Sequence, residues 1–171
     1  MDAIVEQWER ERPDLDVSAL ALFGRLFRAA HLADSELAVV ARASGLGPGW
    51  FDLLAALRRT GAPYALNPTE LIRATLLSSG GMTKRIDRLA AAGLVVRLPD
   101  PSDRRGTLIR LTPAGLAAID EALPAHVASE ERLLAPLTAP ERRSLDRLLR
   151  KLVGGLDEPA SPTGGHRRDR R

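Results

Sequence analysis

The chain of 171 residues suits one domain of ordinary size, and its 44% hydrophobic content suits a globular fold. It has no cysteine, which excludes disulfides, thiolate metal sites, cysteine nucleophiles and thiol-based redox sensing. The formal net charge is only +3, so the position of the charges says more than their sum.

Neither a membrane span nor a metal site is predicted. No run approaches the roughly 18 apolar residues of a spanning helix, and the charged opening segment MDAIVEQWERERPDLD lacks the apolar core of a secretory signal. We therefore expect a cytoplasmic protein with no membrane partner. His31, His126 and His166 lack metal-ligand spacing, which leaves only a site built from carboxylates open. No cofactor is expected.

Two helices are predicted in the first part of the chain. Apolar residues recur at helical spacing over residues 18–44, with Ser18 as the expected N-cap. A second helix is predicted over residues 50–60, and the sequence GAPYAL at 61–66 is a break.

Two closely spaced helices follow. The first begins at residue 67, where Asn67 can cap, Pro68 suits the first helical position, and Glu70 can close a capping box. The second covers residues 78–93, SSGGMTKRIDRLAAAG, and Gly93 is expected to end it. On a helical wheel Met82 falls beside other apolar residues, so this stripe is predicted to face the core.

A β-hairpin is predicted next, with strands at residues 94–98 and 107–111. Alternation places Leu94, Val96 and Leu98 on one face with Thr107, Ile109 and Leu111, and Val95, Arg97, Leu108 and Arg110 on the other. A half-buried hairpin follows from this period of two.

The last part of the chain reads as two further helices and a tail. A helix is predicted from Thr112 to about residue 135, bent or interrupted at Pro124. The sequence TAPE at 138–141 is a second capping box and opens a helix to about Val153. The charged, Pro- and Gly-rich residues 157–171 are predicted to be disordered.

Positive charge is concentrated in the middle of the chain. Residues 67–110 hold eight basic and four acidic side chains, a balance of +4 that exceeds the charge of the whole chain. Such a segment is typical of a protein that binds nucleic acid.

The order of helix, turn, helix and hairpin predicts a winged helix-turn-helix, in which the second helix enters the major groove of DNA. Small and hydroxyl residues at the start of that helix let its N-terminus approach phosphates. From this helix the residues expected to contact DNA are Ser78, Ser79, Gly80, Thr83, Lys84 and Arg88.

The loop LPDPSDRRG between the strands carries Arg104 and Arg105 at its tip. A hairpin beside a major-groove helix extends toward the adjacent minor groove, where arginine is favoured. Asp103 is expected to orient one guanidinium. The alternative is a solvated loop whose acidic and basic residues pair only with each other, and the preceding helix pair argues against it.

The segment from residue 77 to 115 closely resembles the MarR family of bacterial transcriptional regulators. The likeness rests on the recognition-helix pattern, the D-x-x-D-R-R sequence of the wing and the L-T-x-x-G that follows it, and it covers roughly residues 18–156. The resemblance implies a homodimer in which the first and last helices of two subunits interleave. An apolar stripe in the last predicted helix, which a small winged domain could not cover, agrees with it: Leu145, Leu148, Leu149, Leu152 and Val153.

The expected fold is therefore mainly α with a small β-hairpin wing: a winged helix-turn-helix with N- and C-terminal dimerisation helices. Its parts are an extra N-terminal helical segment at 1–17, dimerisation helices at 18–66 and 112–156, the DNA-binding unit at 67–111 and the disordered basic tail at 157–171.

The chain also resembles the urate-responsive branch of that family, which carries an added N-terminal helix. In that branch a Trp, an Asp and two Arg form the ligand pocket, and the matching residues are Trp8, Asp52, Arg85 and Arg97. The resemblance implies a planar anionic effector such as urate or xanthine. Each residue also has a plain structural explanation: Trp8 as a packing anchor, Asp52 as a helix-dipole contact, Arg85 extended to solvent and Arg97 as a solvated strand residue.

The predicted function is a ligand-responsive regulator, expected to be a repressor, that binds a pseudo-palindromic double-stranded DNA operator as a homodimer. A phenolic or small-carboxylate effector is the alternative for the ligand, and a non-specific architectural DNA-binding protein is the alternative for the class. The peroxide-sensing branch is excluded by the absence of cysteine. An enzyme is not expected, because no nucleophile–base pair, phosphate-binding glycine loop or metal motif is found.

Overall fold

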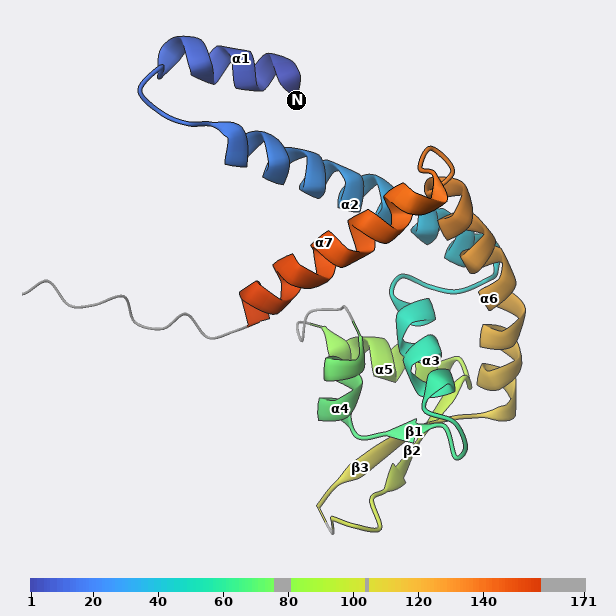
Figure 1. The fold of residues 1–171 in the computed structure, drawn as a ribbon. Helices are drawn as coiled ribbons and strands as arrows, with labels where there is room; N and C mark the ends of the chain where they lie inside the picture. The colour runs from blue at the N-terminus through green and yellow to red at the C-terminus, as the bar shows by residue number, and fades with distance from the viewer. Residues whose placement is uncertain (76–80, 104, 158–171) are drawn as a thin grey trace, which may run out of the picture. The chain divides into compact units, whose positions relative to one another are not determined.

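The computed structural model describes residues 1–75, 81–103 and 105–157 (Figure 1). The chain divides into two compact units, Met1–Arg132 and Leu133–Arg171. The whole winged-helix region lies in the first unit. None of the described helices combines the length and the apolarity that crossing a bilayer requires.

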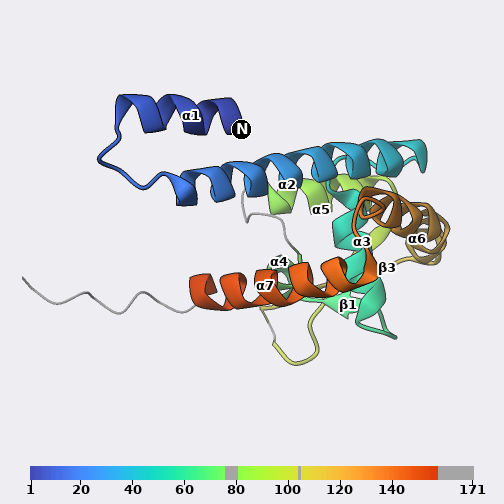
Figure 2. The same cartoon turned by 45° about the horizontal axis from the view of Figure 1, so that its top comes forward.

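Two helices open the first unit, α1 at Asp2–Glu11 and α2 at Ser18–Ala43. The prediction of a helix over 18–44 is confirmed, but its cap is corrected: Val17 occupies the N-cap position, and the Ser18 amide donates to the Asp16 carboxylate at 2.9 Å. An ion pair between Asp2 and Arg25 joins α1 to α2, which lie side by side (Figure 2). Among the described residues of α2 only Ala21 is buried, so α2 exposes most of its apolar surface.

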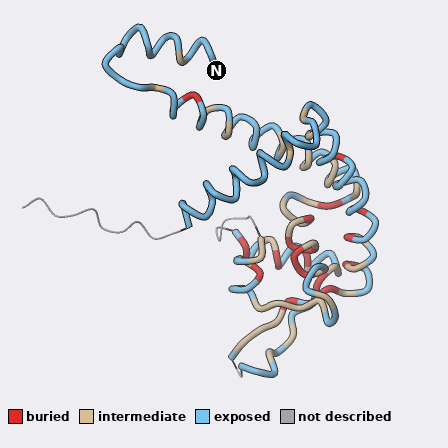
Figure 3. The backbone as a smooth tube through the Cα atoms, viewed as in Figure 1, coloured by how far each residue is buried: buried red, intermediate tan, exposed pale blue. Residues whose placement is uncertain are grey.

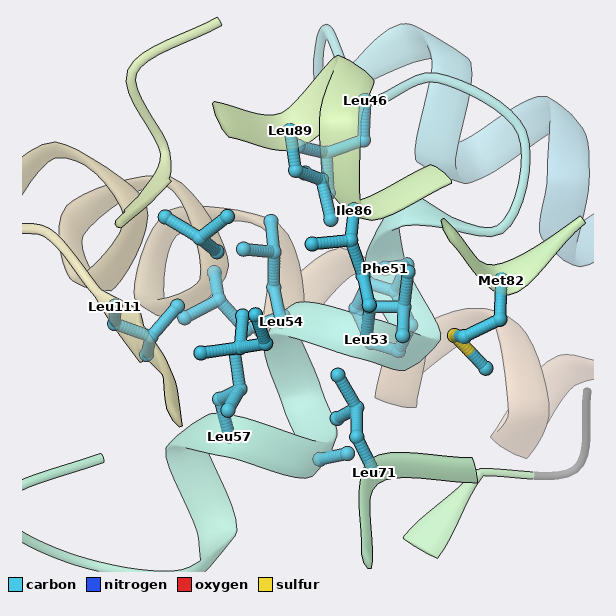
Figure 4. Close-up of a cluster of buried hydrophobic side chains, with 14 of the residues drawn as sticks. Leu46, Phe51, Leu53, Leu54, Leu57, Leu71, Met82, Ile86, Leu89 and Leu111 are labelled. Atoms are coloured by element: carbon cyan, nitrogen blue, oxygen red, sulfur yellow. The ribbon is translucent and has the colours of Figure 1, made fainter. Parts of the chain in front are cut away.

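The core of the first unit is built around α3, Trp50–Arg59. Leu53, Leu54 and Leu57 of this helix have no exposed surface, and they pack with apolar residues of the later helices and strands (Figure 4). Buried positions gather in this region, whereas α1 and α2 are largely exposed (Figure 3). Burial of this apolar surface, which contributes about 25 cal/mol per Å², is the main source of stability in the winged-helix region.

The helix pair begins with α4, Pro68–Ala74. The predicted capping box is confirmed, because Asn67 Oδ1 accepts the Glu70 amide at 2.9 Å and Glu70 Oε2 accepts the Asn67 amide at 3.1 Å. The second member, α5, covers Met82–Ala91 with Gly81 at its N-cap. The predicted start of this helix at Ser78 or Ser79 lies outside the described residues.

The predicted apolar stripe of α5 is confirmed, since Met82, Ile86 and Leu89 are each at most 3% exposed. They hold α5 against the core. The side of the helix that carries Thr83, Lys84 and Arg88 is consequently exposed.

The sheet has three antiparallel strands in the order β1-β3-β2: β1 at Ala65–Leu66, β2 at Val95–Pro99 and β3 at Thr107–Leu111. The hairpin of β2 and β3 was predicted, but β1 was not, because two residues within a turn-rich sequence carry no period-of-two signal. Leu66 pairs with Ile109, so β1 closes one edge of the hairpin.

The predicted faces of the hairpin are wrong. Val95 pairs with Leu111 and Pro99 with Thr107, so the loop comprises residues 100–106, one fewer than the prediction assumed. Directly opposed residues share a face, and a shift of one residue exchanges the faces. The inner face therefore carries Val95 with Ile109 and Leu111, all buried.

A long helix follows the sheet, α6 at Pro113–Leu133. Thr112 caps it, since its hydroxyl accepts the Gly115 amide at 3.0 Å and donates to the Gly93 carbonyl at 2.6 Å. The helix continues through Pro124, so the predicted interruption there is wrong. The alternative, a bend at Pro124, stays a prediction.

The second unit contains α7, Ala139–Asp157, which is longer than predicted. Glu141 Oε2 accepts both the amide and the hydroxyl of Thr138, at 2.8 and 2.6 Å. These bonds lower the pKa of Glu141. Asp157, the first residue of the predicted disordered tail, belongs to α7, and the rest of that tail lies outside the described residues.

Candidate nucleic-acid interface and adjoining pocket

The outward face of α5 carries the side chains predicted to contact DNA. Thr83, Lys84 and Arg88 are all exposed, on the side of the helix away from the buried stripe. Hydroxyl, ammonium and guanidinium groups in this arrangement can donate to phosphates and to base edges in a major groove. Ser78, Ser79 and Gly80, which complete the predicted set on this helix, lie outside the described residues.

The wing loop is shaped by its aspartates. The amide and hydroxyl of Ser102 donate to Asp100 Oδ1 at 2.8 and 2.6 Å, and these bonds lower the pKa of Asp100. Asp103 Oδ1 accepts the backbone amide of Arg105 at 2.9 Å. The carboxylate of Asp103 thus holds the turn itself. That it also orients a guanidinium stays a prediction.

Gly106 closes the loop by accepting the Asp100 amide at 3.1 Å. A Cβ atom at this position would lie 2.9 Å from the Cβ of Asp100 and 3.0 Å from that of Asp103, so a side chain does not fit. Arg105 is exposed next to this turn. Arg104, the other predicted wing contact, lies outside the described residues.

An ion pair joins the wing to the recognition helix. Arg97 Nη2 of β2 donates to Asp87 Oδ1 of α5 at 2.6 Å, and both side chains keep solvent contact. Arg97 was predicted as a ligand-binding residue. The structure places its guanidinium on the exposed surface of α5.

A pocket of about 540 Å³ lies within the first unit, between α2, α3, α5 and α6. Asp52 and Arg85, two of the four predicted ligand residues, both line it. Neither Trp8 nor Arg97 is among its described lining residues. Trp8 lies on α1 and is 46% exposed. The structure therefore brings two of the four predicted residues together.

The wall of this pocket carries charges of both signs. Asp34 and Arg42 come from α2, and Glu130 comes from α6. The His126 ring stacks on Phe51 with 3.7 Å between centroids, and His126 Nε2 lies 3.4 Å from Glu130 Oε1. The pocket is therefore lined by a stacked ring pair together with hydrogen-bond donors and acceptors.

His126 and Glu130 were not predicted as site residues. The signal available in the sequence was their spacing of four residues, which places both side chains on one face of a helix. Nothing in the local sequence indicates that this face of α6 meets α2 and α3, because that depends on the tertiary arrangement.

Comparison with known proteins identifies the family. The MarR family model matches residues 44–106. The HTH-type transcriptional regulator PecS of Dickeya dadantii (strain 3937) is 41% identical over 146 residues, which cover 85% of this chain and 88% of that protein. The chain belongs to the MarR family. The predicted family is thereby confirmed.

Solved structures of this family share the fold of this MarR-family chain. Sco3205 of Streptomyces coelicolor, a MarR family transcriptional regulator solved in complex with DNA, superposes with a TM-score of 0.75 at 25% identity. The match covers 85% of this chain and 91% of Sco3205. The predicted fold, mainly helical with a winged helix-turn-helix, is confirmed.

A second solved relative concerns ligand control. BpsR of Bordetella bronchiseptica, studied for regulation of its DNA binding by 6-hydroxynicotinic acid, gives a TM-score of 0.68 at 30% identity. The match covers 76% of this chain and 91% of BpsR. The MarR-family chain is thus a DNA-binding transcriptional regulator, and its relatives are regulators, not enzymes.

Proposed function

We propose that this protein represses transcription by binding a two-fold DNA operator as a homodimer, and that a small planar anion in the pocket releases it. The observation that carries the proposal is that Arg85 belongs to the recognition helix α5 and also lines the pocket. A ligand that contacts Arg85 acts directly on the helix that reads DNA.

The DNA contacts in the proposal come from α5 and the wing. Thr83, Lys84 and Arg88 would enter the major groove, with Ser78, Ser79 and Gly80 at the helix start. Arg104 and Arg105 would reach the adjacent minor groove. The exposure of the described members of this set supports the assignment.

The dimer in the proposal is supported by exposed apolar side chains. On α2, Phe23 and Phe27 are 41% and 66% exposed. A stripe at helical spacing on α7 is also exposed: Leu145, Leu148, Leu149, Leu152, Val153 and Leu156. A second copy that covers these surfaces, through helices at 18–66 and 112–156, would place two recognition helices about 34 Å apart, one turn of DNA.

The effector in the proposal is a planar anionic heterocycle, with urate or xanthine as the leading candidates. Arg85 would pair with the anionic edge, and Asp52 would accept a ring N–H. Trp8 and Arg97 belong to the proposed set through the resemblance to the urate-responsive branch. A ligand shifts the DNA-bound population only through its differential affinity for two states, and coupling of about 1–3 kcal/mol is typical.

The alternative effector class is a phenolic compound or a small carboxylate. One observation favours it: the relative BpsR is regulated by 6-hydroxynicotinic acid, a planar aromatic acid. Arg85 would serve such a carboxylate equally well.

The test begins with a duplex selected from a random library by the full-length protein, called here the selected duplex. Footprinting should show two related half-sites about one helical turn apart. Urate and xanthine are then titrated in a gel-shift assay beside salicylate and 6-hydroxynicotinate, and the purines should release the duplex at lower concentration. Release by the aromatic acids alone would establish the alternative. Binding without sequence preference would establish an architectural protein and reject the proposal.

A further inference from the structure

The ion pair between Asp87 and Arg97 connects two elements that both face DNA in the proposed function. Arg97 pairs with Ile109 in the sheet register, so its backbone is fixed within the hairpin. Its guanidinium then reaches out of the sheet to Asp87 on α5 at 2.6 Å. This bond ties the strand that leads into the wing loop to the exposed face of the recognition helix.

Asp87 is an unexpected residue at its position. On the helical wheel it lies between Thr83 and Lys84, in the middle of the face proposed to meet phosphates. An unpaired carboxylate there would repel DNA. The Arg97 guanidinium neutralises it and leaves Lys84 and Arg88 to act on phosphate.

The side chains of the pair are 43% and 60% exposed. Exposed ion pairs contribute little to the stability of a fold, because solvent screens them and two side chains lose freedom. The effect to be expected of this pair is therefore on the position of the wing relative to α5, and not on the stability of the fold.

Asp87 also lies on the opposite flank of α5 from the pocket. Two residues along a helix correspond to a rotation of about 200°, so Arg85 points to the pocket when Asp87 points to the surface. Asp87 is thus separate from the proposed effector contact of Arg85 on the same helix, although its partner Arg97 belongs to the proposed effector set.

We infer that Asp87 is a positioning residue for DNA recognition: by holding Arg97, it fixes the wing relative to the recognition helix, so that both reach the same half-site together. This inference rests on the proposed function. Sequence preference depends on simultaneous contact by both elements, whereas non-specific attraction depends mainly on charge. Loss of the pair should therefore reduce preference for the selected duplex without reducing affinity for DNA in general.

The experiment compares Asp87→Asn with Asp14→Asn in the full chain. Asp14 is a matched control, because it also forms a 2.6 Å pair with an arginine, Arg12, and has a 59% exposed side chain. Affinity is measured for the selected duplex and for a random-sequence duplex of equal length. Asp87→Asn should lower the ratio of the two affinities about 5- to 20-fold, which lies within the range of coupling expected for residues in contact.

Two further readouts separate positioning from a general structural role. Hydroxyl-radical footprinting of Asp87→Asn should lose minor-groove protection beside each half-site. Protection of guanine N7 from methylation in the major groove should be kept, and the melting temperature should be unchanged. Asp87→Glu, which keeps the carboxylate, should restore most of the ratio. Arg97→Gln should lower the ratio as Asp87→Asn does, and it should also weaken binding to both duplexes, because it leaves the Asp87 carboxylate unpaired. The double variant should lower the ratio no further than Asp87→Asn alone.

An equal loss of affinity for both duplexes would overturn the inference, as would an unchanged ratio in Asp87→Asn or an additive double variant. Failure of the wild-type protein to select any sequence would instead reject the proposed function. If Arg97→Gln leaves the ratio intact and raises only the urate concentration needed for release, Arg97 is a ligand contact and the inference is wrong.

Discussion

Asp52 of α3 and Arg85 of α5 line one pocket, although they come from different helices of the core and are far apart in the chain. The wall of the pocket thus contains a carboxylate acceptor from α3 and a cation from the recognition helix α5.

Arg85→Gln should raise the urate concentration needed for half-maximal release of the selected duplex by about tenfold or more, because a charge-assisted contact to the anion is lost. The gel shift is run at a DNA concentration scaled to the affinity of each variant, so that changes in basal binding cancel. Arg59→Gln is the control, since Arg59 is exposed and does not line this pocket. Equal sensitivity of both variants to urate would remove Arg85 from the proposed site.

Lys84→Ala should weaken binding to the selected and random duplexes alike and lower the slope of log affinity against log salt by about one, as expected for one lost phosphate contact. Lys151→Ala on α7 is the matched control, because Lys151 is also exposed. The measurement is fluorescence anisotropy over a range of salt concentrations. A slope that stays unchanged in Lys84→Ala would place the ammonium away from the backbone of DNA.

The hydrogen bonds from Ser102 hold the pKa of Asp100 below its ordinary value. The lowered pKa means that the folded state favours the ionised carboxylate. The contribution of Asp100 to the stability of the wing turn is therefore fully present at neutral pH. The turn loses this contribution as the pH falls through the lowered pKa. In an NMR titration of the carboxyl carbons, Ser102→Ala should move the pKa of Asp100 upward and leave that of Asp14 unchanged. Identical titration of Asp100 in both proteins would show that the hydroxyl bond is absent in solution.

Asn67→Ala should reduce the free energy of unfolding by about 1 kcal/mol, because the Glu70 amide at the start of α4 loses its acceptor. Asn67→Asp keeps an acceptor and should stay within a few tenths of a kcal/mol of the wild-type value. Urea unfolding is followed by circular dichroism at one fixed protein concentration, since association would otherwise alter the midpoint. Equal destabilisation by both substitutions would indicate a role other than capping.

Leu148→Glu should weaken the proposed dimer by at least about tenfold, since the apolar stripe of α7 would then bury an unpaired charge. Arg147→Glu introduces the same side chain on the opposite side of the helix and should leave association intact. Sedimentation velocity over a dilution series gives the dissociation constants. A monomeric wild-type protein at micromolar concentration would reject the dimer altogether.

The elements that could be predicted from sequence are those whose signals are local. The capping box at Asn67 and the stripe of Met82, Ile86 and Leu89 follow from caps and helical spacing, and the structure agrees with both. The hairpin faces could not be predicted reliably, because one residue of loop length decides which side chains point inward. β1 could not be predicted, because its two residues pair with a strand more than forty residues later in the chain.

The candidate site was predictable only in part for the same reason. The family resemblance predicted Asp52 and Arg85 as ligand residues, and both line the pocket. The contribution of His126 and Glu130 depends on where α6 passes α2 and α3, and the pairing of Arg97 with Asp87 depends on the register of the wing. Both are tertiary facts that no single segment encodes.

Lys84 and Arg85 are neighbours in the chain, yet one projects to the surface and the other to the pocket. In the proposed function, effector binding and DNA binding therefore use different sides of one short helix. Substitutions in the pocket residues of α2, α3 and α6 would then change which effector binds, while the exposed residues of α5 that face DNA stay the same. Effector specificity could thus change during evolution while operator specificity is kept.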